Sequence, residues 1–468
     1  MSDNNLWRLP ATELARRYRD RSLTPLAVAQ DCLGRLQAVN PRINAVVARR
    51  DAAFIAEARA ATDRWARGAP LSPIDGIPLT VKDSLYTADL PTTWGCPALR
   101  DHRTGHDELA VARARAGGAL MVGKTNVPEF ALEGYTDNPV FGATRNPWDL
   151  ALTPGGSTGG GVAALAAGIA PLAIGQDGGG SIRRPASHTG VVGLKPSLSA
   201  VPREHVLPSL LLDFEVVGPL ARTVADVRLL FEVMRGPAAV DRSSLAAAHA
   251  AGQPASAGPL RILYVERFGA APLDPQVAAS VAGAVDQLAA LGHRVERGPL
   301  SLDLDFFAAA WPQIGQAGLA RLFEHAPKWQ AAASQKYRDM AELGERIPAS
   351  RLWDILERVR QLRRDAATLF EHVDAIALPC AAALPWPAQD AYPLRIDGQD
   401  VGPRGHAIYT GWVNAAGLPA LALPCAPSRE GLPIGMQVVG RYGGDDLLLD
   451  LGAGYEAAHP WAERWPPL

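Results

Sequence analysis

Lysine is scarce in this chain of 468 residues, in which five of the 46 basic side chains are lysine and the other 41 are arginine. The five are Lys82, Lys124, Lys195, Lys328 and Lys336. Arginine stays charged in proteins, whereas a buried lysine can lose its proton. A position that keeps lysine against this bias is a candidate for proton transfer, and the bias favours Lys82 for that role.

Cysteine is also sparse, and its spacing excludes two kinds of site. Cys32, Cys96, Cys380 and Cys425 are scattered and form no C-x-x-C pair, which argues against a zinc site and against a disulfide framework. Buried free thiols are the expected arrangement. Cys96, between Gly95 and Pro97, is the one cysteine that we consider as an alternative nucleophile.

Strong charge and long apolar runs are missing as well. The formal net charge is -2 and the pI is about 6.6, so the chain has no global basic field for nucleic acid or an anionic membrane. No stretch reaches about 18 apolar residues, and the N-terminus does not resemble a signal peptide. With 48% hydrophobic and 20% charged residues, the composition predicts a cytoplasmic globular enzyme with a small-molecule partner.

The pattern along the chain predicts an α/β protein. Residues 1–70 are expected to be helical, with Thr24 as an N-cap before Pro25 and helices running to Asn40-Pro41 and across 51–67. Further on, short apolar runs separated by glycine predict strands at 77–81, 119–122, 171–174 and 190–194.

The second half of the chain continues this pattern. A strand at 260–265, a helix at 275–291 and a strand at 293–296 follow the order of α/β layers. Residues 303–372 are expected to be mostly helical, with late strands at 375–378 and 420–423. Residues 241–258, rich in Ala, Ser, Gly and Pro, form either a linker or an exposed loop within one domain, and we expect one domain.

Two glycine-rich segments, 153–161 and 176–186, each contain three consecutive glycines. Such runs can present backbone N–H groups to an anion, although either segment alone is also compatible with a surface loop.

Residues 118–125 match the phosphate-binding pattern G-x-x-x-x-G-K-T, but 119–122 are predicted to be the strand itself. Residues 155–159 match G-x-S-x-G, but 146–154 are unlike a central strand, so Ser181 fits the strand-to-turn position better than Ser157.

Taken together, several segments resemble the amidase signature family in order and spacing. They are Gly76 to Asp83, Gly123 to Phe130, the two glycine-rich segments, Gly193 to Pro196, Gly417 to Ala420 and Gly431 to Gly440. The resemblance implies a single large mixed β-sheet flanked by helices on both faces. It also implies one amidase domain over 1–468, with a helical segment at 1–70, a signature core at 75–220 and a variable, pocket-forming region at 300–412.

The resemblance assigns a Ser-Ser-Lys triad. Ser181 is the expected acyl-forming nucleophile, Ser157 the bridging residue after a cis peptide bond, and Lys82 the base. The backbone N–H groups of Gly178, Gly179, Gly180 and Ser181 are expected to form the oxyanion hole. A serine hydroxyl needs a neighbour that takes its proton, and a desolvated, neutral lysine can do so. No metal and no organic cofactor is expected.

The expected function is hydrolysis of a carboxylic amide to an acid and ammonia or an amine, with esters and carbamates as further substrates. Asp177 and Arg183 are expected to form a buried ion pair that braces the nucleophile loop. We expect a monomer or homodimer that binds neither nucleic acid nor membrane. The family commonly has threonine at Gly178, serine at Gly161 and an isoleucine or small residue at Arg184, and that arginine could contact an acidic substrate group.

Two alternatives stay open at this point. The transamidating subunit of a tRNA-dependent amidotransferase is closely similar, although residues 197–205 lack the Gly-Arg-Val-Ser continuation expected of it. A catalytically inactive binding protein would not require both serines and Lys82. For the substrate pocket, the aromatic candidates within the variable region are Trp311, Phe323, Trp386, Tyr409 and Trp412.

Overall fold

The computed structural model describes residues 5–252 and 258–468. Within these ranges, eleven strands form one sheet and two more form a small hairpin. The strands are β1 (Val46–Arg49), β2 (Pro78–Lys82), β3 (Leu120–Thr125), β4 (Leu172–Asp177), β5 (Val192–Lys195), β6 (Val216–Ala221), β7 (Arg261–Tyr264), β8 (Arg294–Arg297), β9 (Ala375–Pro379), β10 (Arg395–Ile396), β11 (Gln399–Asp400), β12 (Ala420–Pro424) and β13 (Gly435–Gly440).

Helices connect and cover the strands. The α-helices are α1 (Ala11–Arg19), α2 (Pro25–Ile43), α3 (Asp51–Ala66), α4 (Leu109–Ala116), α5 (Gly159–Ala166), α6 (Arg183–Thr189), α7 (Val224–Met234), α8 (Ser243–Ala251), α9 (Pro275–Ala290), α10 (Asp305–His325), α11 (Pro327–Ala332), α12 (Gln335–Glu345), α13 (Ala349–Leu369), α14 (Gly411–Ala415) and α15 (Asp445–Ala458). Short 3-10 turns lie at Leu6–Arg8, Pro97–Leu99, Glu129–Ala131 and Gly405–Ala407. Among the helices described here, none is long and apolar enough to cross a membrane.

The large sheet is mixed, as predicted. Its order is β1-β3-β2-β4-β6-β5-β12-β13-β9-β7-β8. β3, β2 and β4 run parallel, as do β9, β7 and β8, and the pairs between these groups are antiparallel. Every residue of β2, β4 and β6 is buried. Strands buried on both sides require cover on both faces of the sheet, which the helices provide.

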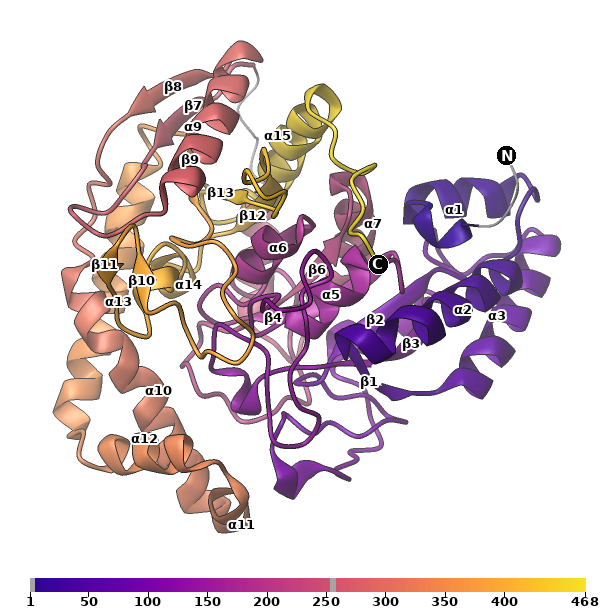
Figure 1. Ribbon diagram of the computed structural model, residues 1–468, viewed down its shortest axis with the longest axis horizontal. Helices are drawn as coiled ribbons and strands as arrows, with labels where there is room; N and C mark the ends of the chain where they lie inside the picture. Colours follow the sequence, from indigo (N-terminus) through magenta and orange to yellow (C-terminus); the bar gives the residue numbers. More distant parts are fainter. Residues whose placement is uncertain (1–4, 253–257) are drawn as a thin grey trace.

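The helices of the variable region lie apart from the N-terminal helices. Figure 1 shows α10 to α13 extending along one side of the molecule, whereas α1 to α3 lie on the opposite side. α10 packs along α12. The sheet lies between these two groups of helices (Figure 1).

Most of the predicted elements are confirmed. The strands expected at 77–81, 119–122, 171–174 and 190–194 correspond to β2, β3, β4 and β5, and the late strands to β9 and β12. The Thr24 side chain caps α2 by accepting a hydrogen bond from the Ala27 N–H. Residues 119–122 lie in β3, so the phosphate-loop pattern there is part of a strand.

Two predictions about local structure were wrong. The segment 1–70 is not entirely helical, because β1 pairs antiparallel with β3 at the edge of the sheet, with Val46 opposite Thr125. The expected linker contains α8, in which the run of alanine favours helix. Residues 253–257 of that linker lie outside the described ranges. The division into one domain stays a prediction.

Candidate active site

Lys82 is the last residue of β2, which lies between β3 and β4 in the sheet. Its side chain is buried. The amine Nζ lies 2.8 Å from Ser157 Oγ and donates a 2.9 Å hydrogen bond to the Gln176 carbonyl at the end of β4. The lysine therefore connects the strand β2 with both glycine-rich segments.

The environment of Lys82 favours a neutral amine. Burial lowers the pKa of Lys82 to about 7, and the charges of Asp177 and Glu215, which would raise it, do not compensate. No carboxylate lies within ion-pair distance of Lys82 in the described ranges. Lys124 differs, because its Nζ lies 3.4 Å from Asp83 Oδ1. At neutral pH a large share of Lys82 is therefore unprotonated.

Ser157 lies in the loop that leads into α5. The Gly156–Ser157 peptide bond is cis, as the resemblance implied. A side chain at Gly156 would place its Cβ 2.1 Å from the Tyr135 carbonyl oxygen, so only glycine fits at this position. Among the described elements, no strand leads directly into this serine, because the element before α5 is the 3-10 turn Glu129–Ala131. The G-x-S-x-G match is therefore not a nucleophile elbow.

Ser181 lies in the turn between β4 and α6, as the sequence predicted for a strand-to-turn position. Its residue is 7% exposed. The Thr158 N–H donates a 3.1 Å hydrogen bond to the Ser181 carbonyl, and the Thr158 hydroxyl donates to the Gln176 carbonyl at 3.2 Å. These bonds hold the two glycine-rich segments, and with them the two serines, side by side.

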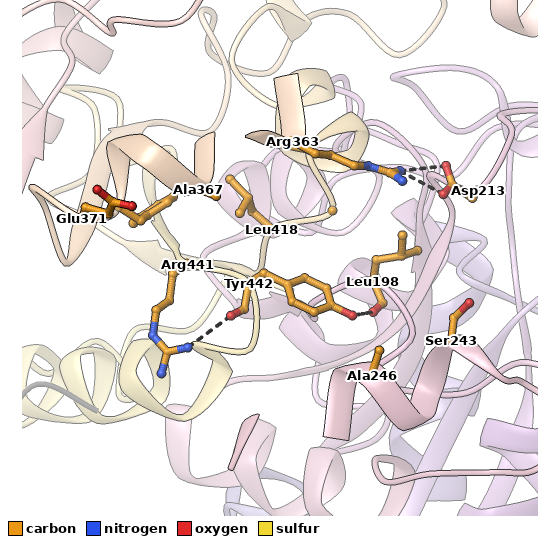
Figure 2. Close-up of a pocket in the computed structure, with 13 residues that line it drawn as sticks. Leu198, Asp213, Ser243, Ala246, Arg363, Ala367, Glu371, Leu418, Arg441 and Tyr442 are labelled. Carbon is orange, nitrogen blue, oxygen red and sulfur yellow. Dashed lines mark hydrogen bonds and ion pairs between the residues drawn. The ribbon is translucent and has the colours of Figure 1, made fainter. Parts of the chain in front are cut away.

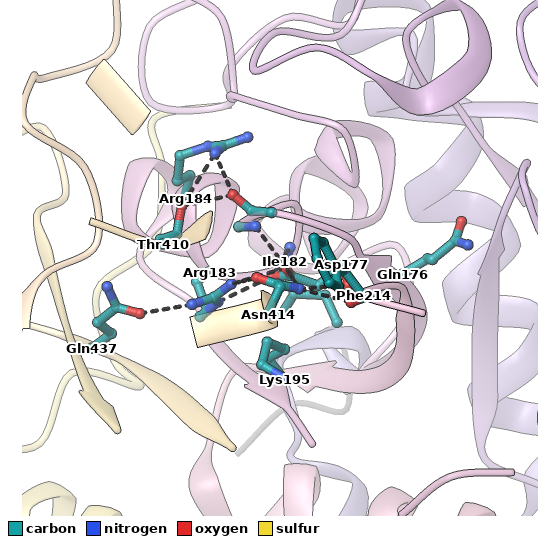
Figure 3. A network of polar contacts seen from close by, with 12 residues as sticks. Gln176, Asp177, Ile182, Arg183, Arg184, Lys195, Phe214, Thr410, Asn414 and Gln437 are labelled. Atoms are coloured by element: carbon teal, nitrogen blue, oxygen red, sulfur yellow. Dashed lines mark hydrogen bonds and ion pairs between the residues drawn. The ribbon is translucent and has the colours of Figure 1, made fainter. Parts of the chain in front are cut away.

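Asp177 organises the turn that carries Ser181 (Figure 3). Its carboxylate accepts hydrogen bonds from the Gly180 N–H at 2.6 Å and the Ile182 N–H at 2.9 Å. Arg183 donates to both carboxylate oxygens, at 3.1 and 3.0 Å, and both side chains are fully buried. Burial alone would raise the pKa of Asp177, but Arg183 and the backbone donors hold it well below its usual range.

Distant parts of the chain complete this network. The Asn414 amide donates to the Asp177 carbonyl and to its carboxylate, both at 2.9 Å, and its oxygen accepts from Arg183. Arg183 also donates to Gln437 Oε1 at 2.9 Å. The predicted ion pair is thus present, and it is fixed by α14 and β13, neither of which the sequence linked to the loop.

Removing the Asp177 charge is expected to destabilise the protein. In Asp177→Asn, Arg183 would remain buried without a counter-ion, and such losses cost about 3–5 kcal/mol. Urea unfolding at pH 7 would measure the change. The matched control is Asp213→Asn, which breaks the partly exposed pair with Arg363 and should cost about 0–1 kcal/mol. Equal costs for the two variants would contradict the bracing role.

The backbone donors near Ser181 are not equivalent. The N–H groups of Gly178, Gly179 and Ser181 make no hydrogen bond to any described residue. The Gly180 N–H already donates to Asp177 Oδ1. The Gly180 N–H is therefore engaged in this geometry, and Asp177 would compete with an oxyanion for it.

A narrow slot joins the three residues to a larger cavity. Lys82, Ser157 and Ser181 line the slot, whose volume is about 20 Å³. A cavity of about 510 Å³ adjoins it and shares Ala131, Leu132, Ser181 and Leu211 with the slot. This arrangement places Ser181 at the end of a space large enough for a small organic molecule.

The cavity is lined differently from the expectation. Of the five predicted aromatic residues, Trp311 lines it, and the other four do not. Phe323 packs against Phe130 in the core, and the Tyr409 hydroxyl donates to the Glu266 carbonyl. Trp386 and Trp412 are buried in the interior. Leu132, Met340, Arg404 and His406 are also among the residues that line it, and no local pattern in the sequence marks them as neighbours.

A second, larger cavity does not belong to this site. It measures about 710 Å³ and shares no lining residue with the slot or its adjoining cavity. Figure 2 shows polar contacts in its lining: Arg363 pairs with Asp213 at 2.9 Å, and the Tyr442 hydroxyl donates to the Leu198 backbone carbonyl at 3.0 Å. It contains none of the predicted site residues.

Cys96 is not suited to act as the nucleophile. Its side chain is fully buried, and burial raises the pKa of the thiol to about 11. A thiol with a raised pKa is unreactive at neutral pH. All four cysteines are buried and free, as expected.

Comparison with known proteins points to one family. The Amidase family matches residues 27–449. The acylamidase of Rhodococcus erythropolis is 32% identical over 481 residues, which cover 100% of this chain and 98% of that protein. One of the subunits of the glutamyl-tRNA(Gln) amidotransferase of Roseiflexus castenholzii is 34% identical over 491 residues, covering 98% of each chain.

Solved structures give the same result. 6-Aminohexanoate cyclic dimer hydrolase in complex with substrate superposes with a TM-score of 0.88 at 29% identity, covering 99% of both chains. A bacterial aryl acylamidase of the amidase signature family superposes with a TM-score of 0.88 at 27% identity, covering 98% of this chain and 99% of the other. This chain belongs to the amidase signature family and is a hydrolase that acts on carbon–nitrogen bonds.

Proposed function

We propose that the chain hydrolyses a carboxylic amide through an acyl-enzyme on Ser181, with Ser157 and Lys82 as the proton relay. The observation that carries this proposal is the contact of 2.8 Å between Ser157 Oγ and a fully buried amine whose pKa is lowered to about 7. A lysine in that state can accept a proton at neutral pH, which an ordinary lysine cannot.

Acylation follows from this geometry. Ser181 Oγ attacks the amide carbonyl carbon while its proton passes to Ser157, and the Ser157 proton passes to Lys82 Nζ. The tetrahedral intermediate then collapses, the C–N bond breaks, and the nitrogen leaves with the proton that Lys82 returns through Ser157. The hydrogen bond between Lys82 Nζ and Ser157 Oγ can carry the proton in both directions. The neutral amine accepts the Ser157 proton, and the ammonium that results donates it back.

Deacylation reverses the roles of the groups. Water attacks the acyl carbon and its proton enters the same relay, after which Ser181 regains a proton and the carboxylic acid departs. The N–H groups of Gly178, Gly179 and Ser181, which have no partner among the described residues, are the candidates to stabilise the oxyanion in both steps. The same steps would cleave esters and carbamates.

A second candidate is the transamidating subunit of a tRNA-dependent amidotransferase. It is favoured by the 34% identity to one of the subunits of such a complex over nearly the whole of both chains. The acylamidase relative and the absence of the Gly-Arg-Val-Ser continuation after Pro196 favour an independent hydrolase. We therefore propose a cytoplasmic monomer or homodimer that acts on small amides, esters or carbamates and binds no nucleic acid.

A substrate panel tests this proposal. The purified chain, without ATP, tRNA or partner proteins, is expected to release ammonia, amine or alcohol from members of a panel of primary amides, anilides, esters and carbamates. A protein that works only in a complex would be silent until its partners are added. Turnover by the chain alone supports the hydrolase, and turnover that appears only with partner proteins contradicts it.

A further inference from the structure

Arg184 is a buried cation without a counter-ion among the described residues. Its residue is 3% exposed and it lines the cavity next to Ser181. Nη1 donates to two neutral oxygens, the Gly179 carbonyl at 2.7 Å and the Thr410 hydroxyl at 3.2 Å (Figure 3). Nε is buried and has no hydrogen-bond partner in the described part of the chain. The carboxylate nearest in sequence, Asp177, is already taken by Arg183.

A second arginine lines the same cavity. Arg404 follows the β10–β11 hairpin, and its guanidinium lies 5.1 Å from the centre of the Trp311 ring. It forms no ion pair with any residue of the described ranges. Burial lowers the pKa of Arg184 to about 9, and the positive charge of Arg404 contributes to this shift.

The remaining charges of the cavity do not neutralise this pair. The other charged residues in the lining are Glu133 and Lys336, and they form an ion pair with each other. One anion and three cations leave an excess of two positive charges. Arg184 is buried and Arg404 is half-buried. An unpaired charge withdrawn from water is costly, so the cavity is expected to bind an anion that offsets this cost.

His406 adds a polar group that faces the same space. It is 3% exposed, lines the cavity, and neither of its ring nitrogens has a partner among the residues described. Gly134 lies against the ring, where an added Cβ would come within 2.2 Å of Nε2. The lining also has an apolar part, which includes Leu132, Leu211, Trp311 and Met340. The cavity thus combines cationic and apolar side chains.

We propose that the amide substrate carries a carboxylate, which Arg184 and Arg404 bind while the apolar side chains of the cavity hold the carbon skeleton. This proposal rests on the hydrolase function given above. Guanidinium groups are well matched to carboxylates, because their planar donors pair with both oxygens. The family commonly has an isoleucine or a small residue at position 184. A preference for carboxylates that depends on Arg184 is therefore a feature of this chain and not of the family.

Matched substrate pairs test the proposal. In the first pair, the 4-nitroanilides of glutaric acid and of valeric acid share a leaving group and differ in the terminal carboxylate. In the second, 4-acetamidobenzoate and 4-methylacetanilide differ on the amine side. We expect kcat/KM to be about ten- to hundredfold higher for the carboxylate member of at least one pair. Arg184→Met and Arg404→Met should each reduce this ratio about tenfold.

The controls separate this proposal from the hydrolase function. Arg59→Met changes an exposed arginine on α3 and should keep the ratio. Calorimetric titration of Ser181→Ala with the same four compounds measures binding without turnover and should show the same preference. Hydrolysis with no preference for either carboxylate, or a ratio that neither cavity variant changes, would overturn the proposal. If nothing is hydrolysed but the carboxylates bind preferentially, the hydrolase fails and the anion site stands.

Discussion

Replacing Ser181 by alanine is expected to lower kcat by about four orders of magnitude or more, as loss of a nucleophile does in serine hydrolases. The expected loss is large because no other side chain in the slot can form the acyl bond. Lys82, Ser157 and Ser181 are the slot residues that carry a hydroxyl or amine, and Ser157 is engaged with Lys82. Steady-state hydrolysis of the best substrate of the panel would measure the effect.

The control for this variant is Ser187→Ala. Ser187 lies on α6, shortly after Ser181, and is also buried, so the substitution removes a comparable hydroxyl from the same region. Its activity should stay within a few-fold of the original chain. Hydroxylamine should trap an acyl group from the original chain and none from Ser181→Ala. A variant that still turns over at the original rate would refute Ser181 as the nucleophile.

The local structure around the site could be predicted from sequence. The apolar run 171–174 before three glycines identified β4 and its turn, which carry Ser181. The threonine and proline at positions 24 and 25 identified the start of α2. These features depend on near neighbours in the chain, whose preferences are visible in any short window.

The contacts that assemble the site could not be predicted in this way. Lys82 and Ser157 are 75 residues apart, and Arg183 and Gln437 are 254 residues apart. Such pairs meet because β2, β4 and β13 occupy particular positions in one sheet, and strand order is not encoded in local periodicity. The resemblance supplied the triad, whereas Asn414 and Gln437 had no comparable signal in the sequence.

The missed strand and the hydrogen bond of Gly180 have different causes. β1 is short and lies between two helices, and it is a strand because its backbone pairs with β3, more than 70 residues further along the chain. Gly180 was assigned to the oxyanion hole with its neighbours, but the turn brings its N–H to the Asp177 carboxylate. The strand depends on a distant partner, which local preference leaves open. The Gly180 bond is made within one turn, whose backbone geometry decides it.

Lys82→Met is expected to lower kcat by about three to four orders of magnitude, since the relay loses its proton acceptor while the buried volume is nearly kept. Lys82→Arg should be similarly inactive, because a guanidinium stays protonated at neutral pH. The pair of variants separates charge from basicity: if the site needed a cation at this position, arginine would restore activity. Measuring both variants on the same substrate gives the answer.

The pH dependence of kcat/KM in the original chain shows whether Lys82 acts in its neutral form. The active form of Lys82 is neutral, and its pKa is about 7, so kcat/KM should fall about tenfold per pH unit below that value and be level above it. Lys195, whose pKa burial also lowers to about 7, donates to the Pro196 carbonyl and touches neither serine. Lys195→Met should therefore retain the fall near pH 7, and the residual activity of Lys82→Met should lack it. If the fall in kcat/KM below pH 7 disappeared in Lys195→Met, the titrating group would be Lys195, and the assignment to Lys82 would be contradicted. The comparison is needed because burial lowers the pKa of both amines to about 7, and only the contact with Ser157 distinguishes Lys82.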